Sequence, residues 1–336
     1  MGTGAVLSFI GNEEIEPERI KEIEVGFDTE FMDNYAVEFT YFNQKAENSI
    51  IESNLAPSTG RIASGVPFNV GEAKGWGVEF LLRGRPLSMR NFVLDFTLTH
   101  SYQENEVLDI GDAQPMYSGW DVNVIKPGLS KYAFYTWKVN GALFDANGAY
   151  AGLDVTDDKY YAGTPIPNHT GSVSLDMRIM RKLNVRVLAD WALGQSMYNN
   201  TSAFQALTGN NEKRNELAAK LSELTPGTDE YTKTANDYAK TSGSYDWNYI
   251  QESDYFKLRE VSLSYDLTSL IPKVTGSNLV SNLVLGVSGI NLWTTTKYPG
   301  ADPEVNSTGS TGLDRSNDFL TLQHPRVYNM WLRIGL

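Results

Sequence analysis

The residue types that most often carry catalysis are sparse in this chain. It contains three histidines and no cysteine, and His100, His169 and His324 lie in separate segments. A zinc site or a Ser-His-Asp triad needs several side chains that converge on one point, and no spacing here places a partner beside any of the three. We therefore predict no catalytic residue, no metal site and no cofactor, and we do not expect an enzyme.

Carboxylates are plentiful but are not spaced for chemistry. Asp154, Asp157 and Asp158 lack the regular ligand spacing of a calcium loop, so we interpret them as a solvated turn. Glu22 and Glu24 fall on the same side of a predicted strand, whereas the carboxyl pair of a glycosidase flanks a cleft. These acidic residues are more typical of a hydrated channel wall than of an active site.

Aromatic side chains in the long connections are the best candidates for binding. Rings in loops stack on sugars or pack against a partner, and loops carry a large share of binding residues. The alternative is that some of these rings form the aromatic belt at a membrane surface. The candidates for substrate contact are Trp120, Tyr132, Tyr135, Trp137, Trp247, Tyr249, Trp293 and Tyr298.

Composition excludes several classes of partner and of membrane segment. With 41 acidic and 28 basic residues the net charge is −13, and nucleic-acid binding requires a basic face. No stretch approaches the run of about 18 apolar residues that a transmembrane helix needs. Residues 1–10 have no basic segment ahead of an apolar core, so they do not resemble a signal peptide. We expect the chain to be a part of a longer protein.

The elements that must position these rings are strands. From Val261 to Tyr265, apolar residues occupy every second position, and the residues between them are serines. This period of two places the two sets on opposite faces of a strand, and repeats of about ten residues are typical of a transmembrane β-barrel. Phe256 and Leu258 are out of phase with Val261, which predicts a β-bulge near Glu260. The predicted strands cover 19–31, 35–43, 70–83, 91–102, 169–180, 183–193, 255–266, 283–287 and 328–336.

The predicted connections alternate between short and long. Short turns follow the first, third and fifth strands, while long segments cover 103–168 and 194–252. Outer-membrane barrels have short periplasmic turns and long extracellular loops, so this alternation favours a barrel. We predict an irregular region at 103–168 with one short strand at 132–139, and helices at 211–224 and 229–240. The alternative is a secreted β-sandwich or propeller, whose strands also alternate.

Several segments, in this order, resemble one family. They are Glu16–Asp28 (EPERIKEIEVGFD), Asn69–Glu79, Tyr161–Pro167, Ser253–Tyr265 (SDYFKLREVSLSY), Val287–Trp293, Lys297–Glu304 (KYPGADPE) and Pro325–Tyr328. Together they are similar to the C-terminal barrel of SusC/RagA-like TonB-dependent outer-membrane transporters of Bacteroidota. The resemblance covers nearly the whole chain.

The resemblance implies an all-β fold, an antiparallel transmembrane barrel of about 22 strands around a plug. Residues 1–336 would form its C-terminal part with about nine spanning strands and a small helical insertion in an extracellular loop, and the plug and N-terminal strands would be absent. The location would be the outer membrane of a Gram-negative cell. The function would be import of glycans, peptides or other bulky nutrients.

The resemblance also implies partners. These are a SusD-like surface lipoprotein that acts as a lid, the TonB–ExbB–ExbD complex through the missing N-terminal part, and outer-membrane lipid. The barrel-assembly machinery would read the last strand, although Leu336 stands where the family usually ends on an aromatic residue. We interpret Lys297–Glu304 as loop architecture and not as a substrate contact.

Two other functions fit the same pattern. A siderophore-type TonB receptor would share the barrel and would more often lack a lid lipoprotein. A secreted β-rich adhesin or glycan-binding module would share the alternation without a membrane.

Overall fold

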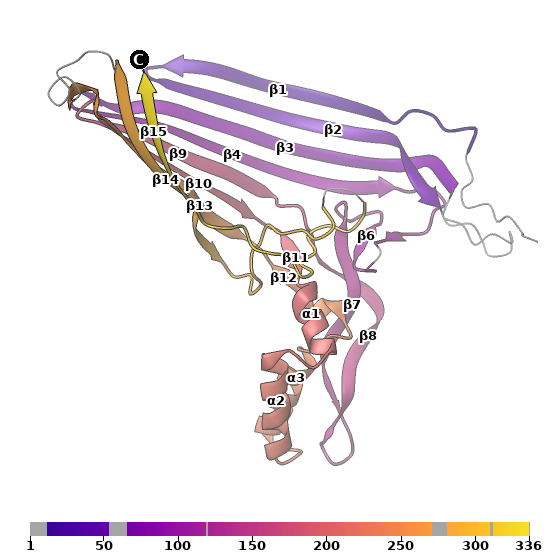
Figure 1. The fold of residues 1–336 in the computed structure, drawn as a ribbon. Helices are drawn as coiled ribbons and strands as arrows, with labels where there is room; N and C mark the ends of the chain where they lie inside the picture. Colours follow the sequence, from indigo (N-terminus) through magenta and orange to yellow (C-terminus); the bar gives the residue numbers. More distant parts are fainter. Residues whose placement is uncertain (1–11, 54–65, 119, 271–280, 310–311, 336) are drawn as a thin grey trace, which may run out of the picture.

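The chain forms one long curved sheet with a second body of loops at one end (Figure 1). The computed structural model describes residues 12–53, 66–118, 120–270, 281–309 and 312–335, so residues 1–11 and Leu336 lie outside the described residues. Nine antiparallel strands pair in the order β1-β2-β3-β4-β9-β10-β13-β14-β15. We call this sheet the wall. Its strands are β1 (Arg19–Phe31), β2 (Tyr35–Ser53), β3 (Val66–Met89), β4 (Phe92–Asp109), β9 (His169–Ile179), β10 (Leu183–Leu193), β13 (Tyr255–Asp266), β14 (Asn282–Thr296) and β15 (Val327–Gly335).

The wall confirms the predicted strands, but β2, β3 and β4 run further than the sequence pattern predicts. The apolar alternation stops near Asn43 and Tyr102, where charged residues begin, and we expected the strands to end there. The backbone ladder continues regardless, and outside the apolar zone the side chains pair as ions. Lys21 bridges Glu47 at 2.6 Å, and Lys45 bridges Glu72 at 2.9 Å.

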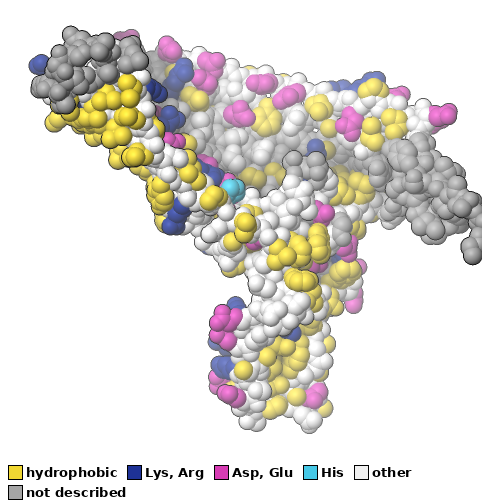
Figure 2. All heavy atoms as spheres, viewed as in Figure 1, with side chains coloured by type: hydrophobic (Ala, Val, Ile, Leu, Met, Phe, Trp, Pro, Cys, Tyr) yellow, Lys and Arg dark blue, Asp and Glu magenta, His cyan; other side chains and the backbone are white. Residues whose placement is uncertain are grey.

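The wall has two faces of opposite character. On one face, which we call the outer face, apolar side chains of neighbouring strands lie opposite one another, as in the pairs Leu175–Val187 and Leu263–Val287. Many of these side chains are exposed, among them Ile23, Val25, Phe27, Met330, Leu332 and Ile334. Figure 2 shows such apolar side chains as a continuous yellow patch over the β13–β15 end of the wall.

The other face, which we call the inner face, is polar. Glu22, Glu24 and Asp28 of β1 alternate with the apolar set, and Asp176 of β9 lies opposite Arg186 of β10. Ion pairs cross between strands here, for example Arg85–Asp95 at 2.7 Å. A two-faced sheet of this kind matches a barrel wall between lipid and a hydrated lumen.

The predicted β-bulge is present. The register of β13 against β14 shifts between Leu258 and Glu260, and Arg259 has no opposite residue. The same region shifts against β10 between Leu188 and Ala189. The bulge changes the phase of β13, so that the residues before and after it both keep their apolar side chains on the outer face.

The long connections gather at one end of the wall (Figure 1). We call the body formed by residues 110–168, 194–254 and 297–326 the loop module. It contains a four-stranded sheet, a strand pair and three helices. Its elements are β5 (Met116–Tyr117), β6 (Asn123–Ile125), β7 (Ala133–Phe144), β8 (Tyr150–Gly163), β11 (Ser196–Tyr198), α1 (Asn200–Leu207), α2 (Glu212–Glu223), α3 (Asp229–Ala239), the 3-10 helix η2 (Asp246–Tyr249) and β12 (Ile250–Glu252). On the short-turn side, η3 (Thr268–Leu270) follows β13.

The loop module both confirms and corrects the sequence predictions. The helices predicted at 211–224 and 229–240 are α2 and α3, within a residue at either end. The short strand predicted at 132–139 is confirmed as part of β7, but the prediction that the rest of 103–168 is irregular is wrong, because β5 to β8 form a sheet there. Asp154, Asp157 and Asp158 lie within strand β8 and not in a turn. None of the helices in the described part of the chain has the length and apolar character to span a bilayer.

The largest hydrophobic core of the described chain lies in the loop module. Val122, Phe134 and Tyr249 are buried together with Ala203 of α1. Val122 lies just before β6, and the others come from β7, η2 and α1, so the core joins the first and second long connections. Apolar side chains gather in such a core when the surface around it is in water. The core therefore agrees with a loop module that lies outside the membrane.

Candidate functional site at the inner face

A group of charged side chains joins the inner face to the last long connection. Lys257 of β13 is buried, and its ammonium lies 2.6 Å from Asp302 Oδ1 and 2.5 Å from Glu304 Oε2. The phenol of Tyr255 donates to Glu304 Oε1 at 2.7 Å. Arg259, the unpaired residue of the bulge, contacts Glu304 and also donates to Asp190 of β10 at 2.8 Å. Tyr255, Lys257 and Arg259 alternate along β13 up to the bulge, so their side chains share one face and all three reach the same carboxylate.

We call this group the inner cluster; its members are Asp190, Tyr255, Lys257, Arg259, Asp302, Glu304 and His324. His324 Nδ1 lies 2.9 Å from Asp302 Oδ2. The segment Lys297–Glu304 is thus held to the wall by two carboxylates that meet two cations. This agrees with the interpretation of that segment as loop architecture.

The carboxylates of the inner cluster stay ionised over a wide pH range. Burial on its own raises the pKa of Asp302, but hydrogen bonds from Lys257 and His324 outweigh it and lower the pKa to about 2. Burial likewise opposes ionisation of Glu304, whereas Arg259 and Lys257 bring its pKa to about 2. Near neutral pH both carboxylates are therefore charged and paired.

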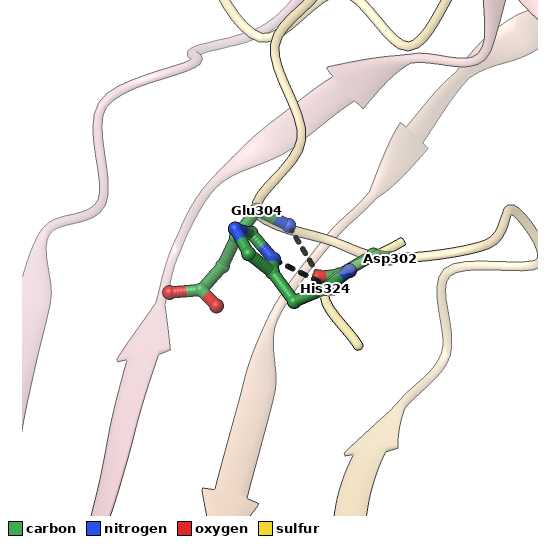
Figure 3. A group of neighbouring side chains, drawn as sticks. All are labelled: Asp302, Glu304 and His324. Carbon is green, nitrogen blue, oxygen red and sulfur yellow. Dashed lines mark hydrogen bonds and ion pairs between the residues drawn. The ribbon is translucent and has the colours of Figure 1, made fainter. Parts of the chain in front are cut away.

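The inner cluster has the donor atoms of a metal site, but a cation is already in place. One ligand atom each of Asp302, Glu304 and His324 lies within 4.8 Å of the others. Figure 3 shows His324 joined to Asp302, with the Glu304 carboxylate turned away from the imidazole. The ammonium of Lys257 lies between the two carboxylates, where a divalent ion would have to sit. The arrangement therefore supports an ion-paired anchor.

A pocket of about 650 Å³ lies beside the inner cluster, where the inner face meets the loop module. We call it the mouth pocket. Thr170, Ala192 and Tyr255 line it from the wall. Its other side chains come from the loop module and are mostly apolar or aromatic; they include Tyr132, Pro165, Ile166, Pro167, Met197, Pro303, Val305 and Arg315. The guanidinium of Arg315 lies 4.8 Å from the ring centre of Tyr132. The pocket thus offers apolar side chains, the ring of Tyr132 and the guanidinium of Arg315 to a molecule that enters the mouth.

The aromatic residues predicted to contact substrate lie in four different places. Tyr132 lines the mouth pocket. Tyr249 and Tyr298 are buried, and their hydroxyls bond Thr241 and Asp318, which corrects the expectation of free rings. Trp293 belongs to β14 and not to a loop; it packs against Phe256 with ring centres 6.3 Å apart and lines a hollow together with Lys257, Asp302 and His324.

The remaining predicted rings lie on the surface of the loop module. Tyr135 and Trp137 line a second hollow with Tyr117, Tyr160 and Tyr161. Trp120 packs against Phe319 at 5.3 Å. Trp247 lies under the ammonium of Lys138 at 5.7 Å.

The expectation that no histidine has a partner is wrong. His100 Nε2 and His169 Nδ1 lie 3.3 Å apart on the outer face, and His324 contacts Asp302. Strands β4 and β9 pair across the long insertion between them, which brings His100 opposite Gly171 and diagonal to His169. Gly171 has no side chain, and the ring of Trp191 fills the space beside it.

The residues of the inner cluster were missed because they are far apart in the sequence. Lys257 and Arg259 lie in a strand whose alternation is broken there, and that break was the available signal. Polar residues occupy every second position of β13 before the bulge, and this pattern would have indicated that charged side chains lie on the inner face. Their partners Asp302 and Glu304 lie 45 and 47 residues beyond Lys257 along the chain.

Comparison with known proteins agrees with this architecture. A family model for the TonB dependent receptor-like β-barrel matches residues 2–214. TonB-dependent receptor P3 of Formosa agariphila is 23% identical over 366 aligned residues, which cover 98% of this chain and 35% of the relative. The chain thus spans about a third of the length of the curated relative it matches.

Solved structures share the fold. The RagAB peptide transporter aligns over 94% of this chain and 35% of its own, with a TM-score of 0.74 and 16% identity. The RagAB peptide importer in its open-open state aligns over 97% of this chain and 35% of its own, with a TM-score of 0.73 and 19% identity. At this level of identity the likeness establishes the fold alone.

Proposed function

The chain belongs to the family of TonB-dependent receptor-like β-barrels, and we propose that it forms the C-terminal wall of a SusC/RagA-type transporter that imports a bulky nutrient. Members of this family are outer-membrane transporters and receptors, so the outer face of the wall lies against lipid. The observation that carries the proposal is the mouth pocket at the junction of the inner face and the loop module. A molecule on its way into a lumen passes this junction.

We propose that the wall is completed by further strands of a longer receptor. Within the described sheet, β1 and β15 are edges, and every described side chain of β1 is exposed. Unpaired backbone groups are costly in lipid, which supports closure by other strands. The coverage of only 35% of the curated relative supports the same proposal. A plug and the contact with TonB–ExbB–ExbD would then lie in the rest of that receptor, and β15 would be the strand that the barrel-assembly machinery reads.

The mouth pocket suits a glycan or a peptide fragment better than a compact iron chelate. Its prolines, Ile166 and Val305 give extended apolar contact, while Tyr132 provides a stacking face. Arg315, Gln195 and Asn306 add polar groups to the lining, which suits a ligand with dispersed polar groups. The RagAB peptide importer, a structural neighbour, supports a substrate of this size class.

A SusD-like surface lipoprotein is the proposed partner at the loop module. Apolar side chains remain exposed there, namely Trp120, Phe204, Leu207, Leu320 and Leu322. Trp120 and Phe204 both pack on Phe319, so they form one patch. A lid that closes over the mouth would cover such a patch.

The test is binding of labelled neutral oligosaccharides and of peptides of matching mass to the full receptor. We expect Tyr132→Ala and Arg315→Ala to weaken binding of the bound class by about tenfold, because each removes a ring or a cation from the mouth pocket. Arg326→Ala is the matched control, since Arg326 lies on the same connection but does not line this pocket. Equal loss in all three variants, or uptake of iron chelates alone, would contradict the proposal.

A further inference from the structure

A pocket of about 540 Å³ lies where β3 and β4 of the wall meet the loop module, and it shares Ile166 with the mouth pocket. We call it the rim pocket. Lys74 and Trp76 of β3 line it, together with Glu104 and Glu106 of β4. In the register, Trp76 lies opposite Glu104 and two positions from Val78, so these side chains continue the apolar row of the outer face. One wall of the rim pocket is therefore formed by the outer face.

The rim pocket begins where the aromatic belt of the outer face ends. Trp76 packs against Tyr102 with ring centres 5.4 Å apart, and Tyr102 packs against His169 at 4.7 Å. His100 continues the row to Trp191 at 6.1 Å. Tryptophan and tyrosine collect at the level of lipid headgroups, so this row marks the membrane surface. Trp76 belongs to both the belt and the pocket, which places the pocket at headgroup height.

The lining of the rim pocket is suited to a saccharide. The hydroxyls of Ser130 and Thr164 lie 3.0 Å apart, and Lys74 is paired with Glu106 at 2.7 Å. Tyr161, which is about half exposed at 49%, forms another wall of the pocket. Hydroxyls, carboxylates and ring faces are the groups that hydrogen-bond and stack on sugars.

The surface continues upward from the rim pocket onto the loop module. Tyr161 also lines the second hollow, of about 740 Å³, with Tyr135 and Trp137. The ammonium of Lys159 lies 4.4 Å from the ring centre of Trp137 and 2.9 Å from Asp121. We call the two hollows together the outer groove. Its length fits a chain of several sugars better than a single ring.

The charges of the outer groove argue against a bare anion. Its carboxylates are Glu104, Glu106, Asp157 and Asp158, against the ammonium groups of Lys74, Lys126 and Lys159. Lys74 and Lys159 are already paired with carboxylates. Phosphate alone would meet net repulsion, so the sugar part of a ligand must supply the contacts.

We propose that the outer groove docks the saccharide headgroup of an outer-leaflet glycolipid, with the acyl chains against the apolar row below Trp76. A single glycolipid would then contact the apolar outer face with its acyl chains and the polar groove above it with its saccharide. The proposal rests on the membrane orientation of the wall and is independent of which nutrient is imported. A soluble saccharide would lack the contribution of the apolar row.

The experiment compares the full receptor purified from outer membranes with three variants. Lipopolysaccharide retained per receptor is measured by native mass spectrometry after exchange into nanodiscs of phosphatidylethanolamine and phosphatidylglycerol. Trp137→Ala removes a ring from the outer groove, and Ser130→Trp fills the rim pocket. Trp120→Ala is the matched control, since Trp120 is similarly exposed on the loop module but lines neither hollow.

We expect retention to fall about fivefold or more in Trp137→Ala and Ser130→Trp and to stay unchanged in Trp120→Ala. Addition of the delipidated saccharide at the same concentration should not displace the lipid. Equal retention in all variants would overturn the proposal. Full displacement by the delipidated saccharide would also overturn it, because the groove would then be a site for a soluble sugar. Failure of the unmutated receptor to take up glycans or peptides, with the expected pattern of lipid retention in the variants, would count against the proposed transport function and leave this inference intact.

Discussion

The wall and the loop module place their apolar residues in opposite ways. On the wall, apolar side chains lie outside, and Met330 is 77% exposed on the outer face. In the loop module, Val122 and Phe134 are completely buried. The same chain is therefore built for two solvents, lipid around the wall and water around the loops. The wall depends on the membrane and on strand closure for its stability, whereas the loop module depends on its own core.

The largest expected effect sharpens this contrast within the loop module. Phe134→Ala opens a cavity in the core that joins β7, β11, η2 and α1, and we expect a loss of about 3–5 kcal/mol there. Limited proteolysis of the full receptor should then cut within 110–168 and 194–254. The wall should still show heat-modifiable gel mobility. Loss of that mobility would mean that the two regions fold as one unit.

A charged residue placed on the outer face tests whether that face of the wall lies in lipid. Leu175 and Ser174 are neighbours in β9 with side chains on the outer and inner faces. We expect Leu175→Arg to cost about 2–4 kcal/mol in the bilayer and Ser174→Arg to cost little, because only the first places a cation in lipid. The measurement is the fraction of full receptor that assembles in the outer membrane. Similar assembled fractions for the two variants would contradict the contrast between the outer and inner faces.

The inner cluster joins the wall to the loop module. Its loss should therefore detach the last long connection, residues 297–326, from the wall. Lys257→Met leaves Asp302 and Glu304 without their shared cation. We expect a cost of about 2–3 kcal/mol, below that of a fully buried pair, because the cluster borders a hydrated lumen. Hydrogen exchange of residues 297–309 should rise, while exchange of β13 changes little. Lys297→Met is the control, since its pair with Glu252 is exposed.

The smallest expected effect is a pH dependence of the same anchor. The pKa values of Asp302 and Glu304 lie near 2 in the folded protein and near 4 when unfolded. The stabilisation is therefore fully present above about pH 4.5 and is lost as the pH falls toward 2, with a total of about 1–2 kcal/mol after allowance for solvent screening. Hydrogen exchange of 297–309 between pH 5 and about 2.5 checks this. In Lys257→Met the dependence should flatten; an unchanged profile in that variant would argue that other carboxylates set it.

The sequence predicts the wall well because lipid imposes a simple rule. Each wall strand must alternate to face lipid on one side and a lumen on the other, and residues such as Val173, Leu175 and Met177 follow that rule directly. The strand ends were less accurate, because ladders continue past the apolar zone with charged pairs such as Lys45–Glu72. The bulge near Glu260 was visible as a break in phase.

The loop module and the candidate site could be predicted only in part. The register between β7 and β8 shifts at several points. The alternation of apolar and polar residues is therefore too short to predict strand β8 from the sequence. Helices α2 and α3 were found from their caps and spacing, whereas α1 is short and its buried residues are alanines. The inner cluster requires Asp302 to reach Lys257 from a distant connection, and a single sequence contains no signal for that contact.

The central claim is that alternate residues of each wall strand face lipid and lumen. The chain has no cysteine, so single cysteines can be placed along β9 in a cysteine-free full receptor. The measurement is labelling of intact outer membranes with a membrane-impermeant maleimide. We expect labelling at positions 172, 174 and 176, and protection at 173, 175 and 177. Uniform labelling along the strand, or labelling of the apolar set, would contradict the claim.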